Sequence, residues 1–185
     1  RPERNYWPQP LATPNDPMYV EQWHYPQIRL PDAWDVTTGS PNVTVAVIDT
    51  GILSKHPDFA GQLVAGVDMI SDAENAGDGD GVDSNPEDAG DKELGDSSSS
   101  FHGSHIAGTV AAATNNSVGI AGVAWGSRIM PVRALGRSGG DAFDVIQSIR
   151  FAAGLSNVSG NLPTRRADVI NLSLGGTGFS QSEAD

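Results

Sequence analysis

Cysteine is absent from this chain of 185 residues, basic residues are few and long apolar runs are lacking. Without Cys the chain can form no disulfide and offers no thiol for catalysis or metal binding. Basic residues are few. The 11 Lys and Arg stand against 23 Asp and Glu, a net charge of −12, which disfavours binding to nucleic acids and anionic membranes. No apolar run approaches the ~20 residues of a membrane span, and no signal sequence opens the chain. We therefore expect a soluble, processed polypeptide with no nucleic-acid or membrane partner.

The negative charge is concentrated in residues 72–96, which hold ten of the 23 acidic residues and one basic residue. Their centre alternates carboxylates with glycines, and oxygen ligands separated by flexible residues are what Ca²⁺ prefers, although the spacing does not match an EF-hand loop. The segment is either a solvated acidic loop or a calcium site. Because so much like charge would repel itself without a cation, we favour calcium. The expected ligands are Asp78, Asp80, Asp83, Asp88 and Asp91.

Prolines mark residues 1–17, which hold five of the 12 prolines of the chain. Because these residues show no helical or alternating pattern, we expect an extended arm on the surface, followed by one domain over residues 18–185. A short amphipathic element should pack the arm onto the domain. Its apolar side chains are Trp23, Tyr25, Ile28, Leu30 and Trp34.

The remaining apolar segments alternate between strand and helix patterns. Strands are expected at 43–48, 62–70, 128–135 and 167–174, and helices at 102–113 and 141–153. The inward face of the second helix is expected to comprise Phe143, Val145, Ile146, Ile149 and Phe151. This alternation implies an α/β fold with a mostly parallel sheet and helices on both of its faces. Ligands of such sheets lie beyond the carboxyl ends of the strands.

Three motifs lie at expected strand ends or at the start of a helix. They are Asp-Thr-Gly at 49–51, His-Gly-Ser-His at 102–105 and Asn-Leu-Ser-Leu-Gly-Gly at 171–176. A carboxylate at the end of an apolar strand needs a partner, and a His is suited because the carboxylate fixes its tautomer and stabilises its charged form. Asp-Thr-Gly also occurs in aspartic proteases, but these need a second such carboxylate and the chain has none. A zinc site at His102 and His105 lacks the His-Glu-x-x-His pattern.

Taken in this order, the three motifs resemble those of the subtilisin-like serine proteases, over about residues 14 to 176. The resemblance implies that Asp49 is the catalytic acid and His102 the base. The nucleophilic Ser of the family lies in a Gly-Thr-Ser-Met-Ala segment, which this chain does not contain, so the subtilisin-like fold is expected to be incomplete here. Ser104 and Ile106 stand where the family usually has Thr and Val, and both changes are mild.

The resemblance also implies how substrate and calcium bind. Substrate would add as a strand between two glycine-containing segments, Ser138-Gly139 and Ser173-Leu174-Gly175. Such segments can equally be turns, but both follow expected strands, which favours substrate binding. A further calcium site is implied at the loop 115–120. Its expected ligands are Gln22, Asp58, Asn116 and the carbonyls of Val118 and Ile120.

The sequence thus predicts the N-terminal part of a secreted, calcium-stabilised serine endopeptidase that acts on proteins or peptides. Its nucleophilic Ser would come from a segment or a second chain beyond Asp185. The alternative is an inactive fragment that binds calcium and peptides. We favour the enzyme because, without further strands, the strand ending at Leu174 would be an exposed edge prone to aggregation.

Overall fold

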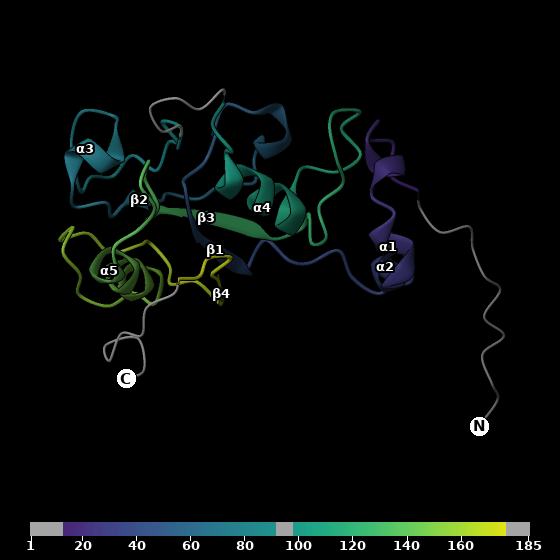
Figure 1. Cartoon of the computed structure of the whole chain (residues 1–185). Coiled ribbons are helices and arrows are strands. Elements are labelled where there is room, and N and C mark those ends of the chain that lie inside the picture. Colours follow the sequence, from purple (N-terminus) through teal and green to yellow (C-terminus); the bar gives the residue numbers. More distant parts are fainter. Residues whose placement is uncertain (1–12, 92–97, 177–185) are drawn as a thin grey trace, which may run out of the picture.

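A parallel four-stranded sheet forms the centre of the protein (Figure 1). In this computed structural model, which describes residues 13–91 and 98–176, the strand order is β2-β3-β1-β4. The strands are β1 (Thr44–Asp49), β2 (Val67–Asp68), β3 (Arg128–Arg133) and β4 (Val169–Asn171). All three pairings are parallel, so the carboxyl ends of the strands meet at one edge of the sheet.

The strand β2 is much shorter than the strand expected over 62–70. Leu63 forms an isolated bridge with Ile129, but the ladder resumes only at Val67. Between these two points β3 contains Pro131, which has no N–H to donate to a neighbouring strand. The pattern of apolar residues could not show this interruption, because its cause lies in the partner strand.

The strand β4 is also shorter than expected and forms one edge of the sheet in the part of the chain that the structure describes. It pairs only with β1 there. Val169 and the following Leu172 are 51% and 41% exposed. An apolar strand with one unpaired side is suited to receive a further strand.

Two helices cover opposite faces of the sheet, which confirms the expected α/β architecture (Figure 1). Alternate residues of β1 point to opposite faces. Val47 therefore packs with the helix α4 (His102–Ala111), whereas Ala46 and Ile48 pack with the helix α5 (Ala142–Ala152). The small residues of α4 allow it to lie close to the sheet. The carboxylate of Asp141 caps α5 by accepting a hydrogen bond from the backbone N–H of Phe143, at 2.7 Å.

One expectation for α5 was wrong, because Phe143 is 50% exposed. The buried face of the helix contains Val145 and Phe151 as expected, together with Asp144, Ser148 and Ala152. At 100° per residue, position 143 lies about 200° from position 145. A large apolar side chain in the first turn therefore points away from the sheet.

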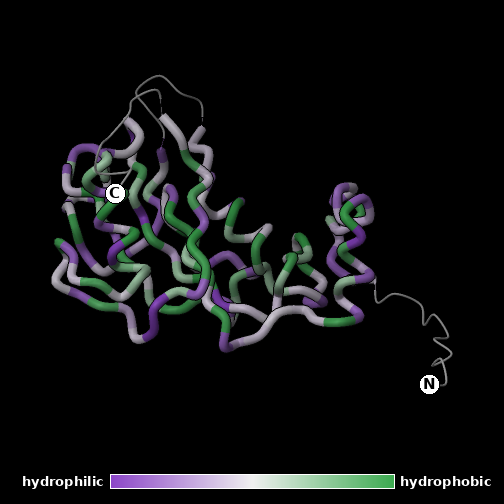
Figure 2. Tube along the Cα trace, turned by 90° about the horizontal axis from the view of Figure 1, so that it is seen from below, coloured by the Kyte–Doolittle hydropathy of each residue, from purple (hydrophilic) through white to green (hydrophobic). Residues whose placement is uncertain are grey.

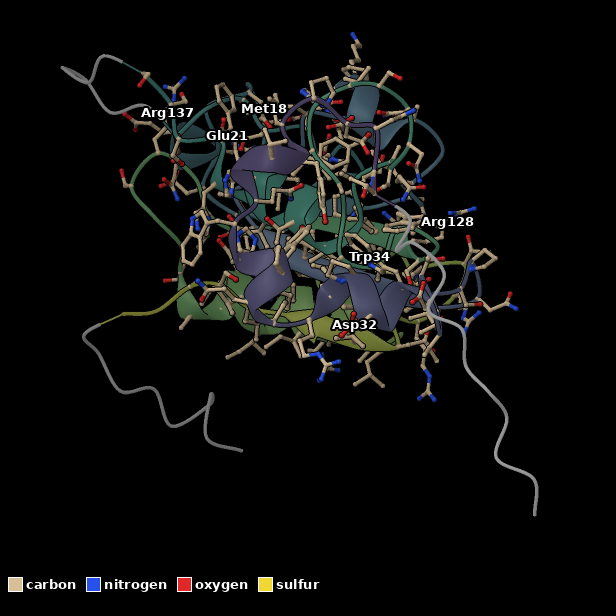
Figure 3. All side chains as sticks on the ribbon, turned by 90° about the vertical axis from the view of Figure 1, so that its right-hand side faces the viewer. Met18, Glu21, Asp32, Trp34, Arg128 and Arg137 are labelled. Carbon is tan, nitrogen blue, oxygen red and sulfur yellow. The ribbon has the colours of Figure 1, made fainter. Side chains whose placement is uncertain are left out.

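The N-terminal aromatic residues form two short helices, α1 (His24–Gln27) and α2 (Leu30–Trp34), after the 3₁₀ turn η1 (Tyr19–Glu21). Green hydrophobic and purple hydrophilic stretches follow one another along them, at the right-hand end of the molecule in Figure 2. Trp34 is buried and its indole N–H donates to the carbonyl of Val123 at 2.9 Å (Figure 3). Tyr25 is fully buried too. Trp23 and Ile28 are exposed, so the expected single amphipathic face is only partly formed.

The described part of the acidic segment, residues 72–91, lies beside the carboxyl end of β2. It contains the short helix α3 (Ala73–Ala76), which follows an N-cap at Asp72. Asp83 exchanges backbone hydrogen bonds with Asp68 of β2. Residues 1–12 of the expected arm and residues 92–97 of this segment lie outside the described residues. No helix in the described ranges is long and apolar enough to cross a membrane.

Candidate active site

The pairing expected between Asp49 and His102 is present in the structure. Asp49 is the last residue of β1 and is fully buried, and His102 is the first residue of α4. The His102 Nδ1 atom lies 2.8 Å from Oδ1 and 3.0 Å from Oδ2 of Asp49. The backbone N–H of Thr50 also donates to Oδ1, at 2.8 Å. The carboxylate is thus held by two groups, and its contact with Nδ1 leaves Nε2 as the imidazole nitrogen able to exchange a proton.

The turn after β1 and the start of α4 are packed against each other without room for a side chain. Gly51 has a φ of +111°, a conformation that favours glycine. A Cβ at Gly103 would stand only 2.4 Å from the carbonyl oxygen of Gly51. The backbone N–H of Gly103 also donates to the Thr50 hydroxyl at 3.0 Å. The two glycines therefore set the distance between Asp49 and His102.

Asp88 lies behind this turn and is nearly fully buried. Its carboxylate accepts hydrogen bonds from the Thr50 hydroxyl at 2.6 Å and from the backbone N–H of Gly90 at 2.8 Å. Burial raises the pKa of the Asp88 carboxyl, although these two hydrogen bonds act in the opposite direction. The sequence assigned Asp88 to a calcium site, whereas the structure places it beside the Asp-Thr-Gly turn.

The two segments expected to bind substrate flank the Asp49 strand, because β3 and β4 are the neighbours of β1. The segment after β3 is a tight turn in which Gly136 and Gly139 exchange backbone hydrogen bonds. The side chain of Asn75 binds the N–H of Ser138 and the carbonyl of Gly139. Substrate can pair at these two positions only by exchanging those bonds.

The segment after β4 is more accessible. Ser173 and Gly175 are exposed, and nothing lies within 4 Å of a Cβ placed at Gly175. Leu174 is half-buried and packs against the core on the α5 side of the sheet. Its packing anchors the segment and leaves the neighbouring backbone accessible at the sheet edge.

The loop 115–120 gathers most of the calcium ligands expected there. Asp58 is 3% exposed, and its two oxygens accept hydrogen bonds from the Asn116 side-chain amide at 2.9 Å and the Ile120 N–H at 3.1 Å. The Asn116 amide oxygen accepts from the Val118 N–H at 2.8 Å. A Cβ at Gly119 would stand 2.0 Å from an Asp58 oxygen, so the loop closes tightly round the carboxylate.

Gln22 has a different role from the expected one, and a second carboxylate faces the loop instead. Both ends of the Gln22 amide bind the backbone of Ala121, at 2.9 Å each. Asp16 is 3% exposed and accepts hydrogen bonds from the backbone N–H groups of Asn115 and Asn116. Sequence reasoning missed Asp16, and the Asn-Asp pair at 15–16 within the proline-rich arm was the signal that could have found it.

The carboxylates expected to share a calcium ion in the acidic segment do not converge. The described residues contain no group of three or more acidic or His side chains placed to hold a metal. Their partners differ: Asp78 pairs with Arg133, Asp83 with the Asn85 N–H, Asp88 with Thr50 and Asp91 with Ser100, while Asp80 is exposed. The repulsion between these carboxylates is reduced by one arginine and by hydrogen bonds.

Comparisons with known proteins agree with this geometry. The model of the subtilase family matches residues 40–185. An extracellular protease of Xanthomonas campestris is 49% identical over 180 residues, which cover 90% of this chain and 30% of that protein. Thermitase of Thermoactinomyces vulgaris is 38% identical over 167 residues, which cover 89% and 49%. The matched part of the chain thus spans between 30% and 49% of the length of these relatives.

A solved structure of a protease from Pseudoalteromonas arctica has the same fold, with a TM-score of 0.85. It is 46% identical to this chain, and the match covers 92% of this chain and 53% of that one. The family model covers more than half of the chain and includes all three motifs. The chain therefore belongs to the subtilase family.

Proposed function

We propose that this chain is the N-terminal part of a serine endopeptidase in which Asp49 and His102 are two members of a catalytic triad. The observation that carries the proposal is the 2.8 Å contact between the buried Asp49 carboxylate and Nδ1 of His102. The His102 side chain is 45% exposed, so Nε2 is accessible to a nucleophile and a substrate. The third member is a Ser that a segment or a second chain beyond Asp185 supplies.

In the proposed reaction His102 exchanges protons with three groups in turn: the Ser hydroxyl, the leaving amine and a water molecule. The Ser Oγ attacks the carbonyl carbon of the peptide bond while Nε2 takes its proton. Asp49 stabilises the imidazolium and keeps Nδ1 protonated. Nε2 then gives the proton to the leaving amine, and an acyl-enzyme ester remains. A water molecule, deprotonated by Nε2, hydrolyses that ester and restores the Ser.

Protein substrates and secretion follow from the same proposal. The matched relatives include proteins named extracellular proteases, from Xanthomonas campestris and Dichelobacter nodosus. Substrate would lie as an added strand along the exposed Ser173-Leu174-Gly175 segment, with the turn at Ser138-Gly139 on the other side. Backbone pairing of this kind gives affinity with little dependence on substrate sequence.

Calcium is proposed at the loop 115–120. Two nearly buried carboxylates, Asp16 and Asp58, both bind this loop, and no Lys or Arg pairs with either among the described residues. Buried charge of one sign is costly without a counter-charge, and oxygen-rich loops are what Ca²⁺ selects. Asp16, Asp58 and Asn116, with the carbonyls of Val118 and Ile120, would hold the ion. Bound calcium would join the N-terminal segment to the loop that follows α4.

The proposal is tested by covalent labelling of active material with a serine-directed fluorophosphonate. We expect the label on a Ser outside residues 1–185, in a polypeptide or segment that remains with this chain until denaturant is added. Asp49→Asn should slow the labelling. If intact mass spectrometry of active, homogeneous sample shows only this 19.3 kDa chain, the proposed source of the nucleophile is wrong. If no sample hydrolyses peptides or reacts with the probe, the chain is better described as a calcium- and peptide-binding fragment.

A further inference from the structure

The largest fully buried side chain of the described residues is that of Arg133, at the carboxyl end of β3. In the sheet register Arg133 stands directly opposite Asp49 of β1 on one side and Asp68 of β2 on the other. Residues paired in register along a sheet point to the same face. The three residues therefore form one row on the same face of the sheet, with Arg133 in the middle position.

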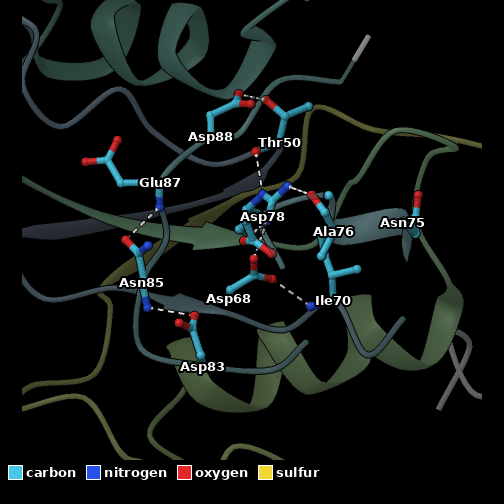
Figure 4. A network of polar contacts seen from close by, with 12 residues as sticks. Thr50, Asp68, Ile70, Asn75, Ala76, Asp78, Asp83, Asn85, Glu87 and Asp88 are labelled. Atoms are coloured by element: carbon cyan, nitrogen blue, oxygen red, sulfur yellow. Dashed lines mark hydrogen bonds and ion pairs between the residues drawn. The ribbon is translucent and has the colours of Figure 1, made fainter. Parts of the chain in front are cut away.

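The guanidinium group of Arg133 binds β2 at one point and the acidic segment at two, and the three partners, Asp68, Asp78 and Ala76, are labelled in Figure 4. Its Nη1 atom lies 2.5 Å from a carboxylate oxygen of Asp68 and 2.7 Å from one of Asp78. Its Nη2 atom donates to the carbonyl of Ala76. Asp78 and Ala76 belong to the segment 72–96, so one buried arginine ties that segment to the sheet.

The same side chain reaches the backbone of the Asp-Thr-Gly turn. Its Nε–H donates to the carbonyl of Thr50 at 3.3 Å. The hydroxyl of Thr50 is in turn bound by Asp88 and by the N–H of Gly103, the residue after His102. Arg133 therefore restrains the peptide group between Thr50 and Gly51, and through Thr50 it is connected to the start of α4.

Arg133 also contributes a positive charge to a region rich in carboxylates. Among the described residues it is the only Lys or Arg that is buried. The buried carboxylates of the row and the turn are those of Asp49, Asp68 and Asp88. Asp78 pairs with Arg133, Asp91 acts on the charge of Asp88, and His105 follows His102 by three residues on α4. Without Arg133 the net negative charge round His102 would be larger, and its imidazolium would be held more strongly.

We propose that Arg133 is a positioning residue of the catalytic centre, which holds the acidic segment against the Asp49–Gly51 turn and opposes the negative charge that faces His102. This inference rests on the proposed protease function. It assigns the acidic segment a part in catalysis, because Asp88 binds the Thr50 hydroxyl and Asp78 binds the arginine that donates to the Thr50 carbonyl.

The test measures kcat and KM against pH in the complete, active enzyme, with calcium in excess and the active fraction counted by fluorophosphonate titration. In Arg133→Met the acid limb of the kcat/KM profile should move to higher pH by about half a unit or more. Its kcat should fall about tenfold or more, with KM nearly unchanged, because the turn is less well placed. Arg133→Lys keeps the positive charge but not the planar set of guanidinium N–H donors. Its kcat should therefore fall, while the acid limb of the profile stays at the same pH.

The matched control is Arg29→Met, which removes an arginine from the exposed Arg29–Asp32 pair. It should change neither kcat nor the pH of the acid limb. Asp78→Asn gives an independent measurement should Arg133→Met fail to fold. It removes one negative charge and should move the acid limb to lower pH, the opposite direction. An acid limb that stays fixed in Arg133→Met, or moves upward in Asp78→Asn, would overturn the inference. An enzyme that is inactive without any substitution would instead overturn the proposed function.

Discussion

Gly103 of α4 lies so close to Gly51 that a Cβ on Gly103 would stand 2.4 Å from the Gly51 carbonyl oxygen and 3.1 Å from the Cβ of Asp49. The contact fixes the start of α4 directly on the turn that carries Asp49. Because His102 precedes Gly103, the absence of one methyl group determines where the imidazole stands. The glycine of the His-Gly-Ser-His motif is therefore part of the site geometry.

Gly103→Ala should lower kcat by about a hundredfold, because a shift of the helix by about 1 Å misplaces His102 relative to Asp49 and substrate. Gly108→Ala is the matched control on the same helix, since its Cβ would meet only a flexible Ile120 methyl group at 3.4 Å. That variant should keep full turnover and gain helix stability. Equal kcat values for the two variants would show that the close approach does not position the catalytic base.

The elements nearest the site could be predicted well from the sequence. The apolar run before Asp49 and the Ala-rich segment after His102 gave β1 and α4 to within two residues, because local pattern and tertiary burial agree there. The outer elements were predicted less well. Pro131 interrupts the ladder beside β2, and Phe143 lies on the outer face of α5. Both outcomes depend on the neighbouring element: on the N–H groups it can donate and on the helix face it covers. The sequence of the segment alone does not contain this information.

The residues of the candidate site were also predicted only in part. Asp49 and His102 were found because each lies in a motif with a recognisable partner. Asp16 and Arg133 were missed because their roles arise from contacts far away in the sequence, with Asn115 and with Asp68 and Asp78. A buried arginine between carboxylates looks like an ordinary charged residue at the end of a strand until the register is known.

Calcium removal should destabilise the protein. At a free calcium concentration of a thousand times Kd, one site contributes about 4 kcal/mol to the free energy of unfolding. We expect chelation to lower the Tm of the native protein, and Asp58→Asn to remove that response. Asp80→Asn should keep it, because Asp80 is exposed and lies in the acidic segment, outside the 115–120 loop. Thermal unfolding with and without chelator, together with metal analysis, distinguishes the two regions. An unchanged Tm in chelator and a metal-free native sample would contradict the proposal.

Tyr25 should make stability depend on alkaline pH. Burial raises the pKa of its phenol from 10.0 to about 12, with Tyr19 adding to the shift and Gln22 opposing it. Between pH 10 and 12 the folded state keeps a proton that the unfolded chain releases. The contribution of this group is therefore fully present below pH 10 and lost as the pH rises through 12.

Replacing Tyr25 by Phe separates this effect from other alkaline titrations. At neutral pH the variant should lose about 1 kcal/mol, because the phenol no longer donates to the Ala121 carbonyl. Its free energy of unfolding should then fall less steeply than that of the native protein between pH 10 and 12. Parallel curves over that range, from denaturant unfolding at each pH, would show that Tyr25 ionises normally.

Asp49 is proposed to act in catalysis through His102, and the most direct test is the kcat of Asp49→Asn in the complete enzyme. An amide cannot hold the imidazole in the required tautomer or stabilise its charge, so kcat should fall by about 10⁴ while the fold is kept. Asp32→Asn, which alters an exposed carboxylate paired with Arg29, is the control and should leave kcat unchanged. A loss near 10⁴ with an unchanged Tm and an intact control is the predicted result. Near-normal turnover in Asp49→Asn would contradict the account.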